Sequence, residues 1–475
     1  MAKKIGLIIG PLLFFLLSNS PIELLNPAAD KVIAVAVWMI IWWITETVSI
    51  SVTALIPLTI FPLIGIMDLK SVAASYGSPI VFLFFGGFVM ALALEKVNLH
   101  RRIALNLVKR TGTTPNKIIL GFMLATAFLS MWISNTATTV VMLPIALSVI
   151  HLLIDDADGF TQQDKYFALS LMLGIAYAAN IGGIATIIGT PPNTVIVGFL
   201  ERQYDMDISF LKWMMIGIPF SAFMISVTYL LLTKVIYPNN LPVLSNTAAL
   251  IDEEIAKLGP MTGLERRVLI VFALTIFLWI TRIYSEDLLP TISLSDTGIS
   301  MLACLALFSV PYSFRKQEFV LSWEDTQKLP WGILILFGGG LALAAGLADA
   351  GVIEFIGSVV SANPKLTPLL VGVALIAIVL FMTELMSNVA LVAIFAPVVA
   401  GIAVGLDQDM LYFLIPTAMA SSCAFMLPMA TPPNAIVFAS GHIKVSEMAR
   451  AGILLNVISI GVITLFMYWV IPLVF

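Results

Sequence analysis

Long apolar stretches, separated by short charged or turn-rich segments, recur along the whole chain. A helix that crosses a lipid bilayer needs about 20 predominantly apolar residues, so stretches of this kind predict membrane-spanning helices. The pattern predicts an all-α, polytopic membrane protein with about 11 transmembrane helices. These helices are predicted at residues 5–22, 32–48, 50–66, 79–97, 166–200, 213–237, 267–283, 297–312, 331–348, 411–440 and 452–474.

Two further apolar stretches, 118–153 and 366–405, are each divided by a polar tip. The first tip is Ser-Asn-Thr at 134–136, and the second is Ser-Asn-Val at 387–389. The arms on either side of each tip are short for a full crossing of the bilayer. We therefore expect two re-entrant hairpins, which dip into the membrane and return to the side from which they came.

Composition and charge agree with this architecture. The chain is 60% hydrophobic and 11% charged, with a mean hydropathy of +1.04, whereas soluble globular proteins contain roughly 25% charged residues. With a cytoplasmic N-terminus, the layout places most Lys and Arg residues on the cytoplasmic side, as the positive-inside rule requires. Only six fall on the other side: Lys31, Lys70, Arg202, Lys212, Arg282 and Lys365. We predict a plasma (inner) membrane protein of a bacterium, with its C-terminus outside and no nucleic-acid partner.

The two halves of the chain repeat each other. Phe-Gly-Gly at 85–87 recurs at 337–339, and Pro144 in the first hairpin has a counterpart in Pro397. Because the layout makes the two hairpins enter the membrane from opposite faces, the repeat is predicted to be inverted, as in many secondary transporters. The predicted parts are a first half at 1–237, a cytoplasmic linker at 238–266 and a second half at 267–475.

Two of the predicted spans, 166–200 and 411–440, contain the tetrapeptide Thr-Pro-Pro-Asn, at 190–193 and 431–434. The residue before a proline avoids helical geometry, so Thr190 is expected to end one half-helix, and its hydroxyl can cap the next. Each broken helix would then point free N–H groups and a partial positive charge into the membrane. Such a helix end favours an anion, for example a carboxylate.

The hairpin tips supply complementary chemistry. An asparagine amide donates to a carboxylate and offers an oxygen to a cation, and Ser and Thr hydroxyls serve either purpose. Sodium needs several oxygen ligands, which unwound backbone carbonyls at half-helix ends provide. Either motif alone indicates little, since a Pro-Pro pair usually marks only a kink. Their duplication predicts one central anion site with two flanking cation sites.

Other functions find no support in the motifs. The chain has no His-Glu-x-x-His motif, no Gly-x-Ser-x-Gly elbow and no pair of membrane aspartates, which argues against an intramembrane enzyme. A channel rarely needs duplicated broken helices. Cys304 and Cys423 form no Cys-x-x-Cys motif, and we expect no disulfide, metal centre or cofactor other than sodium as a coupling ion. Glu46 and Glu384, in or beside apolar stretches, fit an ion-linked role and a structural hydrogen-bonding role equally well.

At these motifs, the chain resembles the divalent anion:sodium symporter family of di- and tricarboxylate carriers, over essentially its whole length. The resemblance implies a homodimer in which each protomer has a scaffold domain and a mobile transport domain that moves as an elevator. It implies substrate contacts at Asn135, Thr136, Thr190, Pro191, Asn388, Val389, Thr431 and Pro432. It also implies one sodium site at Ser130, Ser134, Asn135 and Gly189, and a second at Thr383, Met386, Asn388 and Ala430.

The second tip departs from the family pattern, because Val389 stands where that pattern has a threonine. The missing hydroxyl makes the predicted anion site asymmetric and fits a smaller dicarboxylate. The leading hypothesis is secondary active transport of C4–C5 dicarboxylates, such as succinate, malate, fumarate or 2-oxoglutarate, in symport with sodium. A sodium-independent dicarboxylate exchanger and a carrier of another divalent anion such as sulfate stay open as alternatives.

Overall fold

The computed structural model describes residues 2–19, 25–154, 161–241, 245–288, 294–313, 318–363 and 365–475. Most of the described chain is helical, as predicted. Seven helical stretches within it are long and apolar enough to cross a membrane, and further apolar helices are shorter. The chain is thus an integral, all-α membrane protein, while the predicted number of spans stays a prediction.

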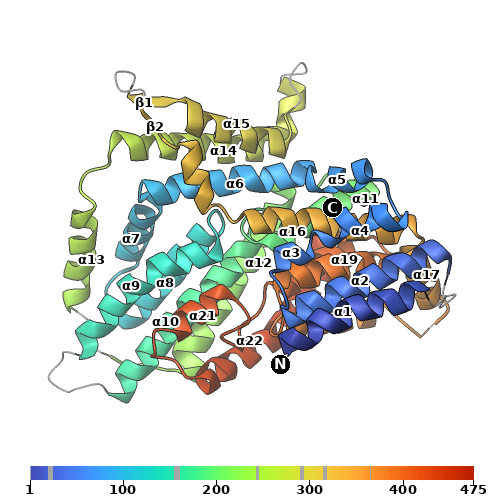
Figure 1. The fold of residues 1–475 in the computed structure, drawn as a ribbon. Helices are drawn as coiled ribbons and strands as arrows, with labels where there is room; N and C mark the ends of the chain where they lie inside the picture. Colours follow the sequence, from blue (N-terminus) through green and yellow to red (C-terminus); the bar gives the residue numbers. More distant parts are fainter. Residues whose placement is uncertain are drawn as a thin grey trace.

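The elements of the first half follow one another from the N-terminus (Figure 1). They are α1 (Ala2–Asn19), α2 (Pro27–Thr45), α3 (Ile50–Thr53), α4 (Ile56–Ile64), α5 (Leu69–Tyr76), α6 (Pro79–Lys96), α7 (Leu99–Thr111), α8 (Pro115–Ser130), α9 (Asn135–Ile154), α10 (Gln162–Ile184), α11 (Pro191–Tyr204), α12 (Phe210–Leu230) and the π-helical η1 (Leu231–Ile236).

The remaining elements begin with a helix inside the predicted linker and include one small antiparallel pair of strands. They are α13 (Ser245–Lys257), α14 (Gly263–Leu288), α15 (Asp296–Ser309), β1 (Pro311–Ser313), β2 (Glu318–Phe319), η2 (Trp323–Lys328), α16 (Trp331–Asp349), α17 (Val352–Ser361), α18 (Pro368–Met382), α19 (Asn388–Gly405), α20 (Leu411–Ser421), α21 (Pro432–Phe438), α22 (Val445–Leu465), the π-helical η3 (Phe466–Val470) and α23 (Ile471–Val474).

The internal repeat is visible in the order of these helices. Helices α6 to α12 correspond in order to α16 to α22, with the hairpins α8–α9 and α18–α19 in the same place. In each half the first helix of this series is followed by a residue with positive φ, Asn98 (φ 57°) and Gly351 (φ 76°), which reverses the chain into the next helix. A π-helical segment follows the last helix of each series.

Some predicted boundaries differ from the structure. The span predicted at 50–66 is two short helices, α3 and α4, and α4 contains both Pro57 and Pro62. The predicted linker 238–266 is not only a loop, because it contains α13 and the start of α14; its residues 242–244 lie outside the described residues. So do residues 20–22 of the first predicted span. The strands β1 and β2 were not expected from the apolar pattern.

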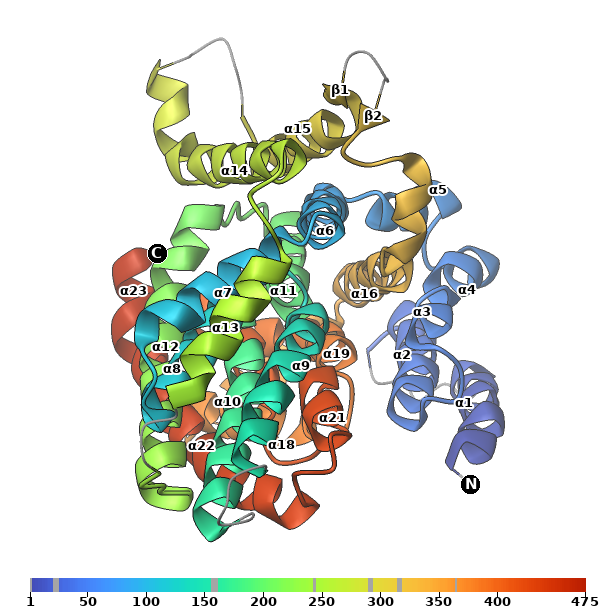
Figure 2. The same cartoon turned by 90° about the vertical axis from the view of Figure 1, so that its left-hand side faces the viewer.

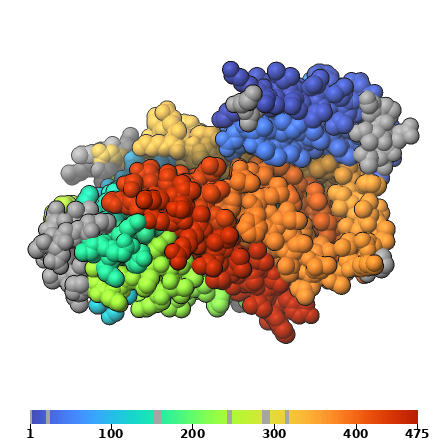
Figure 3. Space-filling model, turned by 90° about the horizontal axis from the view of Figure 1, so that it is seen from below, coloured from blue at the N-terminus to red at the C-terminus, as the bar shows by residue number. Residues whose placement is uncertain are grey.

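Helices α14 and α15 lie along one side of the molecule, where α15 packs on α6 and α14 also touches α12 (Figure 2). Helices α1 to α4 form a lobe at the opposite edge, which the space-filling view shows beside the second half of the chain (Figure 3). Helix α10 runs through the bundle and is buried along its apolar length. It packs closely on α8, because a Cβ added at Gly182 would lie 2.4 Å from the carbonyl oxygen of Ala127.

Candidate functional site

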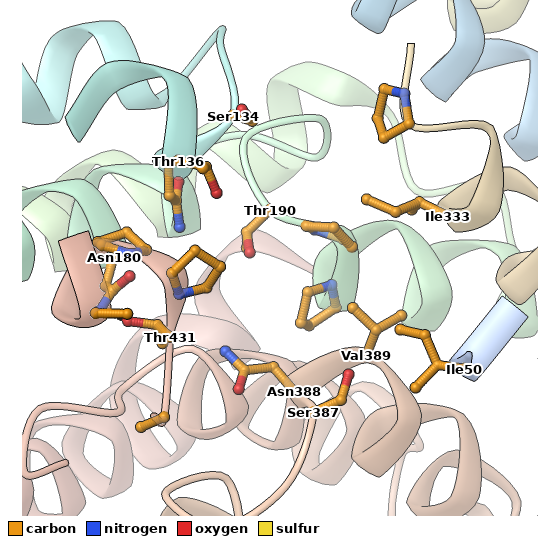
Figure 4. A pocket seen from close by; sticks show the side chains of 18 of the residues that line it. Ile50, Ser134, Thr136, Asn180, Thr190, Ile333, Ser387, Asn388, Val389 and Thr431 are labelled. Atoms are coloured by element: carbon orange, nitrogen blue, oxygen red, sulfur yellow. Dashed lines mark hydrogen bonds between the residues drawn. The ribbon is translucent and has the colours of Figure 1, made fainter. Parts of the chain in front are cut away.

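The four predicted breaks surround one cavity of about 1310 Å³. Helices α9, α11, α19 and α21 all begin there, in each case directly after a tip or a break. Every residue predicted to contact substrate lines this cavity, and several are labelled in Figure 4. These residues are Asn135, Thr136, Thr190, Pro191, Asn388, Val389, Thr431 and Pro432.

At the first hairpin tip, three oxygen atoms from Ser130, Asn135 and Ala179 lie close together. The hydroxyl of the buried Ser130 contacts Oδ1 of Asn135, and it lies 2.7 Å from the carbonyl oxygen of Ala179 in α10. Ser134 and Gly189, predicted for the same cation site, line the cavity itself.

The second tip repeats this arrangement. The hydroxyl of the buried Thr383 lies 2.6 Å from Oδ1 of Asn388 and 2.6 Å from the carbonyl oxygen of Ser421. Met386 and Ala430, predicted for the second cation site, line the cavity. A hydroxyl has one hydrogen to donate, so it cannot fully satisfy two oxygen atoms at once. In each half a bound cation would satisfy the oxygen that is left over.

In each Thr-Pro-Pro-Asn motif, the asparagine side chain donates hydrogen bonds to backbone carbonyls of the same break. Nδ2 of Asn193 donates to the carbonyls of Gly183, Ile184 and Thr186, with the last bond at 2.8 Å. Nδ2 of Asn434 donates to the carbonyls of Ala424 and Leu427, each at 3.1 Å. Both side chains are fully buried. These bonds satisfy carbonyls that an unbroken helix would have paired, which lowers the cost of unwinding in an apolar setting.

The threonines that open these motifs behave differently from each other. The hydroxyl of Thr431 accepts a hydrogen bond from the backbone N–H of Asn434 at 3.4 Å, as expected for a helix cap. The expectation that the Thr190 hydroxyl caps α11 is wrong, since that residue makes no side-chain capping bond. In Figure 4 its side chain lies between those of Thr136 and Asn388. Because the capping bond is not formed, this hydroxyl is available to a ligand in the cavity.

Asn180 is a site residue that the sequence motifs did not reveal. It lies in α10, is 1% exposed and lines the cavity. Its Nδ2 lies 3.1 Å from Oγ1 of Thr431 and 3.3 Å from the carbonyl oxygen of Ala424, so it joins the first half of the chain to the break in the second. Its Oδ1 has no partner among the described residues. An asparagine in the middle of an apolar helix was the available signal, because such residues are costly in a membrane.

One side of the cavity is apolar. Val389 lies near Ile50 of α3 and Ile333 of α16, on the side away from Asn180 and Thr431 (Figure 4). The position where a threonine hydroxyl was missing in the sequence therefore belongs to a hydrophobic surface.

Charged side chains contribute no net charge to the described lining. It includes two basic residues, Lys3 and Lys328, and two acidic ones, Glu46 and Glu95. A dianion in this cavity would have to be neutralised by amides, hydroxyls, helix N-termini and bound cations. The N-terminus of a helix carries roughly half a positive charge, and α9, α11 and α19 each begin at the cavity.

Comparison with known proteins identifies the family of the chain. The family profile described as "Sodium:sulfate symporter transmembrane region" matches residues 2–475. The chain belongs to the sodium:sulfate symporter family. Membership confirms the resemblance seen in the motifs, and it makes this symporter-family chain a membrane transporter and not an enzyme.

Similar proteins in this symporter family share the whole length of the chain. A protein of Staphylococcus saprophyticus named "Sodium-dependent dicarboxylate transporter SdcS" is 40% identical over 484 residues, which cover 99% of this chain and 92% of that protein. The protein of the same name in Staphylococcus aureus USA300 is 40% identical over 481 residues, with the same coverage.

Solved structures of transporters share the fold. MtrF of Neisseria gonorrhoeae superposes with a TM-score of 0.59 at 12% identity, over 84% of both chains. The YdaH transporter of Alcanivorax borkumensis superposes with a TM-score of 0.55 at 11% identity, over 84% of this chain and 88% of that one.

Proposed function

We propose that this protein carries C4–C5 dicarboxylates, such as succinate, malate, fumarate or 2-oxoglutarate, across the membrane in symport with sodium. The observation that carries the proposal is the duplicated site, in which Asn135 and Asn388 each join an oxygen cluster suited to a cation and a cavity suited to an anion. Full-length relatives at 40% identity are named sodium-dependent dicarboxylate transporters.

Electrostatics supports the coupling to sodium. The described lining offers no excess of basic side chains to a dianion, and bringing an unpaired charge into a low-dielectric site costs several kcal/mol. Two sodium ions beside the anion would remove that cost, so that the ions and the substrate bind together or not at all.

The proposal includes an orientation and a moving part. The charge pattern assigns Lys3 and Lys328 to the cytoplasmic side, and both line the cavity. We therefore infer that the N-terminus is cytoplasmic and that this conformation is open to the cytoplasm of a bacterial cell. The hairpins and broken helices would move together as an elevator against a scaffold that includes α3 and α16, within a homodimer.

Uptake of labelled succinate into proteoliposomes tests this function directly. An inward sodium gradient is expected to raise the initial rate of uptake into vesicles without internal dicarboxylate at least about tenfold over choline, because the unneutralised dianion binds weakly. Internal succinate and external sulfate are varied independently. Uptake that required internal dicarboxylate and ignored sodium would replace symport by exchange, and sulfate that displaced succinate at equal concentration would change the substrate class.

Val389→Thr tests the apolar side of the cavity. The new hydroxyl can donate to a further carboxylate group, and a hydrogen bond to a charged group contributes about 1.5 kcal/mol, which corresponds to about a tenfold gain in affinity. We expect inhibition of succinate uptake by citrate to strengthen about tenfold relative to inhibition by succinate itself. Val140→Thr on the exposed face of α9 is the matched control and should leave both unchanged. Identical inhibition profiles for all three proteins would remove Val389 from the site.

A further inference from the structure

The two breaks differ in length although their motifs match. Helix α10 ends at Ile184 and α11 begins at Pro191, whereas α20 ends at Ser421 and α21 begins only at Pro432. The second break therefore unwinds an additional turn on the α20 side. An additional unwound turn in an apolar bundle needs new partners for its N–H groups.

Glu384 accepts hydrogen bonds from three N–H groups of the second break loop, and the first of them, Phe425, belongs to the additional turn. Its Oε1 accepts hydrogen bonds from the backbone N–H groups of Phe425 at 2.8 Å and Met426 at 2.9 Å, and its Oε2 accepts one from Leu427 at 3.1 Å. A fourth bond comes from Nδ2 of Asn456 in α22, at 2.8 Å. The side chain is 3% exposed. All four bonds are donated to the carboxylate, which matches an ionised carboxylate because that group only accepts.

These bonds change which backbone oxygen atoms at the end of α20 are free to act as cation ligands. In a continuous helix the N–H of Phe425 would bond to the carbonyl of Ser421, four residues earlier. With that N–H held by Glu384, the Ser421 carbonyl is instead met by the Thr383 hydroxyl, at 2.6 Å. The same carbonyl belongs to the oxygen cluster of the second tip. The carboxylate thus frees a backbone oxygen at the predicted cation site.

In the first half, the corresponding hydrogen bonds at the break come from an uncharged side chain, Thr186. Met131 follows Ser130 just as Glu384 follows Thr383, and its backbone carbonyl accepts a hydrogen bond from the Thr186 hydroxyl. That hydroxyl also accepts a bond from the N–H of Gly189, at 3.0 Å. The carbonyl at the first cluster belongs to Ala179, within α10, which continues to Ile184.

The Glu384 carboxylate has no basic partner among the described residues, because none of their ion pairs includes it. It directly follows Thr383 in the chain, and it binds the loop that begins just after Ser421, whose carbonyl belongs to the second oxygen cluster. A buried carboxylate attracts a monovalent cation more strongly than an exposed one does, because the protein interior screens charge far less than water does.

We propose that Glu384 is a positioning residue, which holds the second break open in place of the last turn of α20 and makes the second cation site bind sodium more tightly than the first. The sodium part of this inference rests on the proposed function, and the structural part does not. The carboxylate acts through the break loop and the Ser421 carbonyl.

Amide hydrogen exchange tests the structural part without sodium. In purified Glu384→Gln, exchange of the Phe425, Met426 and Leu427 amides is expected to be at least about tenfold faster than in the unmodified protein. The NH₂ group cannot accept from Leu427, and the neutral amide oxygen accepts more weakly than a carboxylate from Phe425 and Met426. The peptide around Gly189 should be unchanged. Thr186→Val should give the converse result, with faster exchange at Gly189 only. Unchanged exchange at 425–427 in Glu384→Gln would overturn the role of the carboxylate.

Binding of labelled sodium without substrate tests the electrostatic part. Glu384→Gln is expected to lose the tighter of two binding steps, with its Kd raised about tenfold or more, and the melting temperature in sodium-free buffer is measured alongside to show that the variant folds. Glu354→Gln, an exposed glutamate on α17, is the control and should bind sodium normally. Unchanged sodium binding in Glu384→Gln would overturn this part.

The Glu384→Asp variant keeps the negative charge but has a shorter side chain, so it distinguishes the effect of the charge from the effect of the side-chain length. It is also the variant to use if Glu384→Gln does not fold. It is expected to keep the sodium Kd within about threefold, since the charge is retained, and to exchange faster at 425–427, since the shorter side chain reaches fewer N–H groups. A large loss of sodium affinity with unchanged exchange would contradict both roles. If the unmodified protein bound no sodium, the proposed symport would fail, and the exchange rates at 425–427 would still decide whether Glu384 holds the break.

Discussion

Asn388→Ala is expected to reduce kcat/KM for succinate at least about 100-fold, and Asn135→Ala should do the same. Each side chain places its Oδ1 in an oxygen cluster, and no described residue accepts a bond from its Nδ2. Under the proposed function, each alanine variant therefore loses a proposed cation ligand and a proposed anion donor together. Hydrogen bonds to charged groups contribute about 1.5–3 kcal/mol each, and two such losses account for a 100-fold effect.

Initial rates of sodium-driven succinate uptake into proteoliposomes measure this loss, with melting temperatures to show that the variants fold. Asn106→Ala is the matched control, because Asn106 is exposed on α7 and donates only to the carbonyl of Arg102 in the same helix. It should transport normally. Uptake within about threefold of the unmodified rate in Asn135→Ala or Asn388→Ala would refute the assignment of the site.

Gly452→Ala is expected to destabilise the protein and abolish transport, although it adds a single methyl group. A Cβ at Gly452 would lie 2.3 Å from the carbonyl oxygen of Phe425 and 2.5 Å from Cα of Met426. Helix α22 there touches the backbone of the second break loop, which cannot move aside as a flexible side chain could. Overpacking of this kind costs about 1–3 kcal/mol, and it would displace the loop that Glu384 holds.

Gly461→Ala on the same helix is the matched control, because its added Cβ would have no neighbour within 4 Å among the described residues beyond the helix's own backbone. Alanine favours a helix by roughly 1 kcal/mol over glycine, so this variant should melt at the same or a slightly higher temperature. Thermal unfolding in detergent and succinate uptake distinguish the two. Equal melting temperatures and equal uptake for both variants would mean that α22 and the break loop are not in tight contact.

The sequence predicted those parts of the molecule that depend on local patterns. Apolar length predicted the helices, and the residue types at 134–136, 190–193, 387–389 and 431–434 predicted where helices begin, since Pro and Asn favour these positions regardless of what surrounds them. All eight residues expected to contact substrate line one cavity. Their binding roles stay predictions that the asparagine variants test.

What could not be predicted depends on contacts between distant segments. Asn180 meets Thr431 across the two halves, and Glu384 meets Phe425 across a break whose length no local pattern sets. Thr190 has the sequence of a helix cap, yet its hydroxyl makes no capping bond. A single motif does not indicate which distant segment it will contact. The helix in the linker was missed for a different reason, because α13 is polar and the helices were predicted from apolar stretches.

The contacts between halves bear on how such a fold could have arisen. Helix α11 packs against α19 and α20, and α21 packs against α9 and α10, so each half contributes to one shared cavity. With the predicted inverted repeat, a half-length ancestor would have formed a whole cavity as a pair of identical chains inserted upside down relative to each other. Fusion of the two genes would remove the requirement that both copies keep one sequence. Val389 stands at the position equivalent to Thr136, and Glu384 at the position equivalent to Met131, and a fused chain holds both differences in fixed places.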